Sequence, residues 1–182
     1  MNQASDAELI KRACAGEARA FEALLNRHYD TMFKMAFKWV QNRQDAEDIT
    51  QNACIKLARA LGSYEHKAAF TTWLYRLVIN TAIDMKRQEK RHQQAQAEIE
   101  EIAGHENPES ALYAREVIAQ VDKLPEKEKG ALLLVFGEGL SHGEAAYVLG
   151  VKESTVSWYI HEARKKLETF ENLSKKGGRR HG

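Results

Sequence analysis

Polar, aromatic and cationic side chains recur along residues 70–91 at spacings that suit contacts with a nucleic acid. On a helix they form one face that leads to a basic end: Thr72, Tyr75, Arg76, Ile79, Asn80 and Ile83, then Lys86, Arg87, Lys90 and Arg91. Aromatic rings stack on bases, while Lys and Arg contact phosphates. We therefore predict that this face binds a nucleic acid. The alternative is a helix buried on both sides in a bundle, with a basic end that complements the helix dipole.

The opposite stripe of the same segment is apolar and predicts the helix itself. Apolar residues at i, i+3, i+4 and i+7 are typical of a helix that packs on a core. The stripe consists of Phe70, Trp73, Leu74, Leu77, Val78, Thr81, Ala82 and Met85.

A second candidate site lies in residues 141–167, which have the spacing of a helix-turn-helix motif. Ser141 and Glu144 predict a capping box that starts a short helix, and Gly150 can take the left-handed conformation that ends it. A second helix is expected to start at Ser154 or Thr155. Its buried stripe comprises Val156, Ile160, Ala163 and Leu167.

The outward side of this second helix carries short hydrogen-bonding groups and cations, which suit base edges and phosphates in a major groove. Glu162 is an exception, because a carboxylate repels phosphate unless it accepts from a cytosine amine or an arginine. The alternative is a helical hairpin that does not contact DNA. The outward residues are Ser154, Thr155, Ser157, Trp158, His161, Glu162, Arg164 and Lys165.

Composition places the chain among globular proteins, with 182 residues, 43% hydrophobic and 29% charged. No apolar run reaches the roughly 18 residues of a membrane span, and the N-terminus has no signal-peptide pattern, so we expect a cytoplasmic protein. Cys14 and Cys54 lie far apart, and the His residues match no ligand pattern, so we expect no metal and no cofactor. The net charge is only +1, but basic residues cluster at 86–91, 164–166 and 175–180, which favours a polyanion as partner.

The pattern along the chain predicts an all-α protein with two small helical domains. Helices are expected at about 6–15, around 21–39, at 45–61 and at 70–91, and then at about 109–123 and 126–138 before the helix-turn-helix. We place the first domain at 1–91, an acidic linker at 92–111, the second domain at 112–173 and a basic, disordered tail at 174–182.

Four segments together resemble the sigma-70 family in its small, two-domain extracytoplasmic-function (ECF) form. They occur in the family's order and spacing over roughly residues 5–170: AFEALLNRHYDTMFKMA, DAEDITQNACIKLARAL, FTTWLYRLVINTAIDMKR and LPEKEKGALLLVFGEGLSHGEAAYVLGVKESTVSWYIHEARKKL. The resemblance implies sigma region 2 in the first domain and sigma region 4 in the second. It also implies a factor that binds bacterial core RNA polymerase, directs it to promoter DNA and helps to melt the minus-ten region.

The resemblance assigns the candidate residues to three surfaces. The clamp helices of the largest polymerase subunit would be bound by Asp45, Asp48, Gln51, Asn52 and Lys56. The minus-ten element, with one base flipped out beside the 62–72 loop, would be bound by Tyr64, Thr72, Trp73, Arg76, Asn80, Lys86, Arg87 and Arg91. The minus-thirty-five element would be bound by Ser154, Thr155, Ser157, Trp158, His161, Arg164 and Lys165. An anti-sigma factor is a further expected partner, and insertion into a membrane is not expected.

The chain departs from the family pattern at two places. Asn52, Ala53 and Cys54 follow the glutamine that would meet the clamp helices, and Ser157, Trp158, Tyr159 and Glu162 replace expected polar or basic residues of the recognition helix. An alternative function is a sigma-like decoy that binds an anti-sigma factor without reading DNA. An enzyme is not expected, since the chain has no nucleophile elbow and no phosphate-binding glycine loop.

Overall fold

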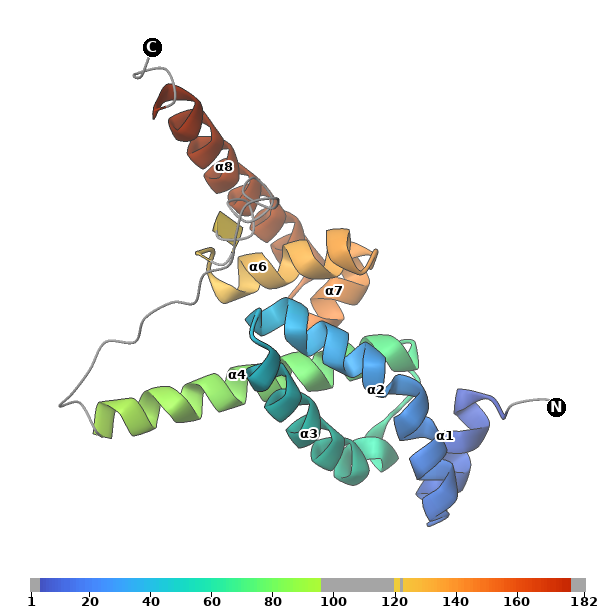
Figure 1. The fold of residues 1–182 in the computed structure, drawn as a ribbon. Helices are drawn as coiled ribbons and strands as arrows, with labels where there is room; N and C mark the ends of the chain where they lie inside the picture. Colours follow the sequence, from blue (N-terminus) through green and yellow to red (C-terminus); the bar gives the residue numbers. More distant parts are fainter. Residues whose placement is uncertain (1–3, 96–119, 122, 178–182) are drawn as a thin grey trace. The chain divides into compact units, whose positions relative to one another are not determined.

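The computed structural model describes residues 4–95, 120–121 and 123–177, and the chain divides into two compact units, Met1–Ala97 and Glu98–Gly182 (Figure 1). The regular elements in the described residues are all helices, which confirms the predicted all-α class. Each unit has its own hydrophobic core.

The first unit is a helical bundle built around helix α2, which packs against all three of its neighbours. Fully buried apolar side chains from α2, α3 and α4 form its core, among them Leu24, Met32, Leu57 and Leu74. The helices are α1 (Asp6–Cys14), α2 (Ala18–Val40), α3 (Arg43–Ala60) and α4 (Phe70–Ala95), with a single 3-10 turn, η1 (Leu61–Ser63), after α3.

Side-chain caps fix where these helices begin. The Ser5 hydroxyl accepts a hydrogen bond from the Glu8 backbone N–H, so α1 starts where the sequence predicts. Helix α3 starts at Arg43, two residues before the predicted Asp45, because the Asn42 side chain accepts from the Asp45 N–H and caps the helix. Both helices thus begin directly after a short polar side chain.

Helix α4 is buried more widely than the sequence predicts. Thr72, Tyr75 and Ile79 were expected on an exposed face, but they are only 3%, 8% and 1% exposed. The expectation of an exposed face is wrong for these three residues, because α4 packs against both α2 and α3. The alternative of a helix buried on two sides therefore holds for its first half. Exposed polar positions begin at Asn80.

The second unit contains α6 (Glu126–Leu132), α7 (His142–Leu149) and α8 (Glu153–Gly177). A turn of π-helix, η2 (Leu133–Gly137), continues α6, so the helix predicted at 126–138 is present with a change of geometry near its end. Helix α8 packs against both α6 and α7. The predicted helix at 109–123 lies almost wholly outside the described residues.

The helix-turn-helix has the predicted local geometry. Ser141 and Glu144 form the capping box of α7, and Gly150 ends the helix with a φ of +64°. Val156, Ile160 and Ala163 are buried as predicted. Helix α8 starts at Glu153 rather than at Ser154 or Thr155, because the Lys152 carbonyl already accepts from the N–H groups of Thr155 and Val156.

Two helices run past the predicted domain limits. Helix α4 continues to Ala95, four residues into the predicted linker, and α8 continues to Gly177, four residues into the predicted tail. Neither stretch contains a proline or an internal glycine that would stop a helix. Residues 174–177 of the predicted tail therefore belong to α8. Residues 96–111 and 178–182 lie outside the described part of the chain.

Candidate nucleic-acid and protein interfaces

An aromatic cluster forms where the loop after η1 enters α4. The Tyr64 ring centroid lies 5.3 Å from that of Phe70 and 5.4 Å from that of Trp73, and the Phe70 and Trp73 rings stack at 5.7 Å with an angle of 20° between planes. The His66 ring centroid lies 4.4 Å from that of Tyr64, with the two rings tilted by 53°. Tyr64 and Trp73 are half-buried, so each ring offers part of its surface to a ligand.

The loop that carries Tyr64 is held by its own contacts. The Tyr64 hydroxyl donates to the Ala68 carbonyl at 2.7 Å, and Lys67 pairs with Glu65. His66 adopts a left-handed conformation with a φ of +55°, an uncommon state for a residue other than glycine. The structure thus brings Tyr64 and Trp73 together, as the base-flipping hypothesis requires, although nine residues separate them in the sequence.

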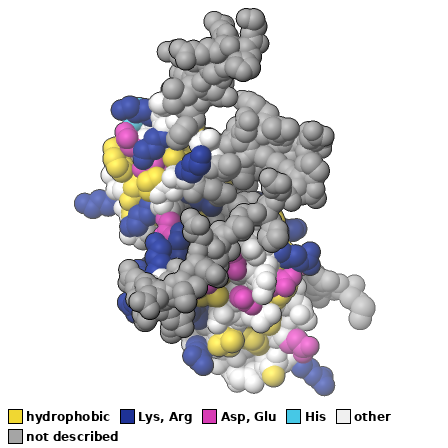
Figure 2. All heavy atoms as spheres, turned by 60° about the vertical axis from the view of Figure 1, so that its left-hand side comes forward, with side chains coloured by type: hydrophobic (Ala, Val, Ile, Leu, Met, Phe, Trp, Pro, Cys, Tyr) yellow, Lys and Arg dark blue, Asp and Glu magenta, His cyan; other side chains and the backbone are white. Residues whose placement is uncertain are grey.

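The other residues predicted to bind the minus-ten element differ in accessibility. Arg76 is half-buried, and Asn80, Lys86, Arg87 and Arg91 are exposed along the rest of α4. Thr72 is buried, so its side chain does not lie on this surface. Figure 2 shows Lys and Arg side chains distributed among acidic and hydrophobic ones on the described surface, in keeping with the low net charge.

The outer face of α3 is a second candidate surface. Asp45, Asp48, Gln51 and Asn52 are exposed there. The same face carries Ile55, which is 54% exposed and was not predicted as a site residue. Ile55 follows Asp48, Gln51 and Asn52 at helical spacing, so the sequence contained the signal. A single exposed apolar side chain is common on protein surfaces, so Ile55 supports a protein-binding surface only together with the predicted polar residues around it.

Two residues of this α3 surface also connect α3 to α4. Lys56 Nζ lies 2.8 Å from Asp84 Oδ2, and Asn52 Nδ2 lies 3.7 Å from the sulfur of Met85. Asn52 also donates to the Asp48 carbonyl at 2.9 Å. Lys56 is half-buried. These two side chains therefore have structural partners within the first unit.

The predicted recognition helix α8 presents most of its candidate residues to solvent. Trp158 is 55% exposed, and Thr155 is half-buried. Glu162, the carboxylate that the sequence singled out, is also half-buried. The exposed candidates, besides Trp158, are Ser154, Ser157, His161, Arg164 and Lys165.

Two neighbours of this helix were not predicted. His142 Nδ1 of α7 lies 2.9 Å from Ser157 Oγ, and the Arg164 guanidinium lies 5.0 Å from the ring centroid of Phe136, which is 58% exposed. The first contact fixes the Ser157 hydroxyl and the second holds Arg164 over an aromatic face. Neither pair is visible in the sequence, because 15 and 28 residues separate the partners.

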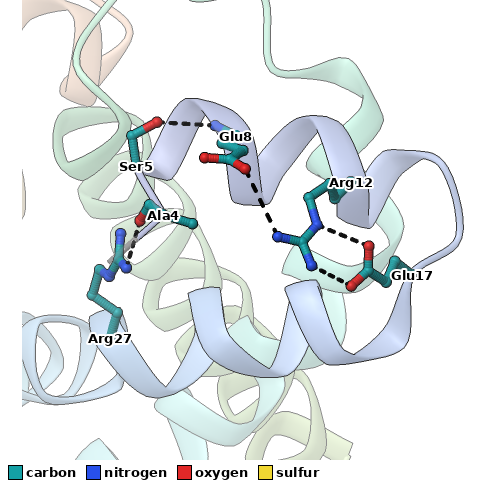
Figure 3. Close-up of polar contacts among 6 residues, drawn as sticks. All are labelled: Ala4, Ser5, Glu8, Arg12, Glu17 and Arg27. Carbon is teal, nitrogen blue, oxygen red and sulfur yellow. Dashed lines mark hydrogen bonds and ion pairs between the residues drawn. The ribbon is translucent and has the colours of Figure 1, made fainter. Parts of the chain in front are cut away.

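Polar contacts attach α1 to α2. Arg12 Nε donates to Glu17 Oε2 at 2.8 Å, and Arg27 donates to the Ala4 carbonyl at 2.8 Å (Figure 3). The hydrogen bond from Arg12, with its positive charge, lowers the pKa of Glu17. Burial alone raises the pKa of Asp6, but its contacts with Arg27 and His28 outweigh that and lower the pKa below its ordinary value. Asp6 is therefore a carboxylate at neutral pH.

The remaining chemical signals are weak. Burial raises the pKa of the Cys54 thiol, which disfavours the thiolate form. Among the described residues, no group of three or more His, Cys, Asp and Glu side chains could hold a metal ion. None of the described helices has the length and apolar character needed to span a bilayer.

The comparisons with known proteins agree with this arrangement of two helical units. Residues 24–92 match the family model of Sigma-70 region 2, and residues 114–167 match that of Sigma-70, region 4. The chain is 32% identical to the ECF RNA polymerase sigma factor SigM of Mycobacterium tuberculosis, over 91% of this chain and 84% of that protein. It is 30% identical to the ECF RNA polymerase sigma-E factor of Escherichia coli, over 91% and 94%.

A solved structure shows the same fold. CnrH, in complex with the cytosolic domain of CnrY, superposes with a TM-score of 0.65 at 25% identity, over 91% of this chain and 96% of that one. The sigma factor RpoE of Bartonella quintana, in complex with the anti-sigma factor NepR, superposes with a TM-score of 0.67 at 21% identity, over 86% of this chain and 99% of that one.

The two family matches and the full-length relatives define a regulator of transcription initiation. The chain belongs to the sigma-70 family of RNA polymerase sigma factors and is a member of its ECF group. The family resemblance predicted from the sequence is confirmed. Proteins of this family act with core RNA polymerase on promoter DNA.

Proposed function

We propose that this protein binds bacterial core RNA polymerase through α3, reads the minus-ten element through α4 and the loop before it, and reads the minus-thirty-five element through α8. The observation that carries the proposal is the aromatic cluster of Tyr64, Phe70 and Trp73, beside the exposed polar and basic side of α4. The combination of stacking rings and cations along one helix suits single-stranded DNA.

At the minus-ten element the cluster would support strand separation. A base that leaves the duplex loses its stacking, and the exposed surfaces of Tyr64 and Trp73 can replace part of that contact. Asn80 can hydrogen-bond to bases, while Lys86, Arg87 and Arg91 lie farther along α4 where the phosphates of the same strand would pass. Thr72 has no direct part in this proposal, because it is buried.

At the polymerase, Ile55 would be the apolar centre of the docking surface. The polar residues predicted there surround it at helical spacing: Asp45, Asp48, Gln51 and Asn52. Lys56 would act mainly through its ion pair with Asp84, which holds α3 against α4. This arrangement couples the polymerase-binding helix to the DNA-binding helix through a direct contact.

At the minus-thirty-five element, α8 would enter the major groove. Ser157 and His161 can hydrogen-bond to base edges, Trp158 can contact a thymine methyl group, and Arg164 and Lys165 can neutralise phosphates.

The domain boundaries, 1–91 for sigma region 2 and 112–173 for sigma region 4, stay part of the proposal. So does an anti-sigma partner, which is supported by the two solved relatives that were captured with CnrY and NepR.

Run-off transcription tests the proposal. The protein is added to sigma-free core polymerase on fragmented genomic DNA of its host, and the 5′ ends of the transcripts are sequenced. We expect discrete starts with shared motifs about ten and thirty-five base pairs upstream. A Trp73→Ala protein is the matched control. Silence of the core with the intact protein, combined with binding to an anti-sigma factor, would replace the proposal by the decoy function.

A further inference from the structure

We propose that α1 is a positioning element for the aromatic cluster, and that it acts through Asp6 and the buried ring of His28. The inference rests on the proposed function, since it assigns to α1 an influence on minus-ten recognition. No family match includes α1, because the region 2 match begins at residue 24. A chain of contacts leads from α1 to Trp73.

The first contact joins α1 to α2. Asp6 Oδ2 lies 2.8 Å from His28 Nε2, and Asp6 Oδ1 accepts from Arg27 Nη1 at 2.6 Å. Because Asp6 is a carboxylate at neutral pH, it accepts from His28, and Nε2 carries the donated proton. Arg27 and His28 are neighbours in sequence, yet they contact different oxygens of the same carboxylate.

The second contact joins His28 to α4. The His28 side chain is 10% exposed, and its ring meets Phe70 edge-on, with centroids 5.1 Å apart and an angle of 78° between planes. Rotation of this ring would leave a largely buried N–H without an acceptor, which is costly. Asp6 thereby fixes the orientation in which the imidazole packs on Phe70.

The third step leads from Phe70 to the surface. Phe70 is 7% exposed and touches both half-buried rings of the cluster, Tyr64 and Trp73. A shift of Phe70 therefore changes how both rings are presented to a base. Asp6 and His28 do not lie on that surface, so they are positioning residues and not base contacts.

Three variants separate the ring contact from the ionic contact. His28→Ala removes both, and His28→Phe keeps an aromatic ring against Phe70 and removes the hydrogen bond. Asp6→Asn leaves the His28 ring in place and weakens the contacts of Asp6 with His28 and Arg27. Arg27→Gln is the matched control, since it removes the other partner of Asp6 but leaves the contact between His28 and Phe70 in place.

The functional measurement uses the holoenzyme, formed from core polymerase and each variant. Its probe is a fluorescent single strand carrying the non-template minus-ten sequence of a promoter mapped by run-off transcription. We expect His28→Ala to weaken binding about three- to tenfold, as for the loss of one aromatic contact. His28→Phe should restore part of that loss, and Asp6→Asn should show a smaller loss of its own, because each variant keeps the ring on Phe70 but weakens its anchor on α1. Arg27→Gln, and the affinity of every variant for core, should stay near the wild-type values.

A second measurement tests the linkage in the free protein, independently of transcription. The three tryptophan indole N–H signals are observed by NMR, and the Trp73 signal is assigned with Trp73→Phe. We expect the Trp73 signal to move in His28→Ala and to move less in His28→Phe. Trp158 lies in the second unit and serves as the internal reference. Both measurements are also made on Asp6→Asn, which tests the same chain of contacts if His28→Ala does not fold.

The outcomes distinguish the two proposals. If wild-type holoenzyme does not bind the single strand, the proposed function fails. If the Trp73 signal of His28→Ala is then also unmoved from its wild-type position, the positioning role is overturned as well. If the wild type binds but either His28→Ala or Asp6→Asn binds equally well, the positioning role of α1 alone is overturned. A loss in His28→Ala that His28→Phe does not restore would also overturn it, because the ring contact would not be the route.

Discussion

Trp73 provides the most accessible test of the aromatic cluster. Its indole is half-buried against Phe70 and Tyr64, so replacement by alanine removes a stacking surface without opening the centre of the core. We expect Trp73→Ala to weaken holoenzyme binding to a minus-ten single strand by roughly 1–3 kcal/mol, the usual loss for one stacked base. Fluorescence anisotropy measures this. Trp158→Ala, a tryptophan of the second unit, is the control and should leave this affinity unchanged.

Lys86 and Arg87 test the electrostatic part of the same surface. Both are exposed near the end of the described side chains of α4. Replacing both by alanine should weaken binding to all promoter sequences alike and should reduce the salt dependence by roughly one to two phosphate contacts. The slope of log affinity against log salt is the measurement. Arg43→Ala, a change of an exposed cation on α3, is the control, and an unchanged slope in the double variant would rule out the phosphate contacts.

For the individual residues of α4, sequence periodicity predicted the helix and its accessible C-terminal half, but not the burial of Thr72, Tyr75 and Ile79. A repeat of 3.6 residues shows where a helix has an apolar stripe, but the width of the buried arc depends on how many neighbours pack against it. The contacts of His28 with Asp6 and of His142 with Ser157 join separate helices. Such contacts depend on tertiary packing, which the local pattern does not contain.

Among the helices, α1 is held against α2 partly by the carboxylate of Asp6, so the stability of this contact should depend on pH. Asp6 has a lowered pKa in the folded protein. Its contribution is therefore complete above the ordinary pKa of 3.8 and is lost as the pH falls through the lower folded value. We expect the difference in free energy of unfolding between wild type and Asp6→Asn to shrink below about pH 4. A constant difference from pH 7 to pH 3 would contradict this.

Helices α6 and α8 are joined by an ion pair between Glu128, which is buried, and Lys166, which is partly exposed. The Glu128 residue is 4% exposed, and both of its carboxylate oxygens accept from Lys166 Nζ, at 2.7 and 2.8 Å. Glu128→Ala should lower the stability of the second unit by roughly 1–3 kcal/mol, as for a lost hydrogen bond to a charged group. Urea unfolding of the full chain measures the change. Glu168→Ala, at an exposed carboxylate of α8, should change stability by less than about 0.5 kcal/mol.

The short-range signals along the helices were the most informative ones in the sequence. Ser141 with Glu144 and the left-handed Gly150 define α7 as expected, because capping depends on residues within one turn. The start of α8 was less predictable. Glu153 begins that helix although the predicted start is Ser154 or Thr155, because the Lys152 carbonyl supplies the first acceptor.

For the whole molecule, the two proposed DNA-binding surfaces lie on separate units, which implies bivalent binding. The first unit carries the Tyr64 and Trp73 surface, and the second carries Arg164 and Lys165 on α8. When one site is bound, the other binds as though at high local concentration, so both contribute to affinity for a complete promoter. A fragment with only one element should respond to changes in only one unit.

We therefore expect the double variant Arg164→Ala and Lys165→Ala to weaken holoenzyme binding to a complete promoter about tenfold or more, as for two lost phosphate contacts. Its affinity for the minus-ten single strand should not change. Trp73→Ala should weaken binding to both probes, because both contain the minus-ten element. Measuring the two variants on the two probes at one salt concentration separates the surfaces. If the α8 variant weakened binding to the single strand as strongly as to the promoter, α8 would not be a separate reader of the upstream element.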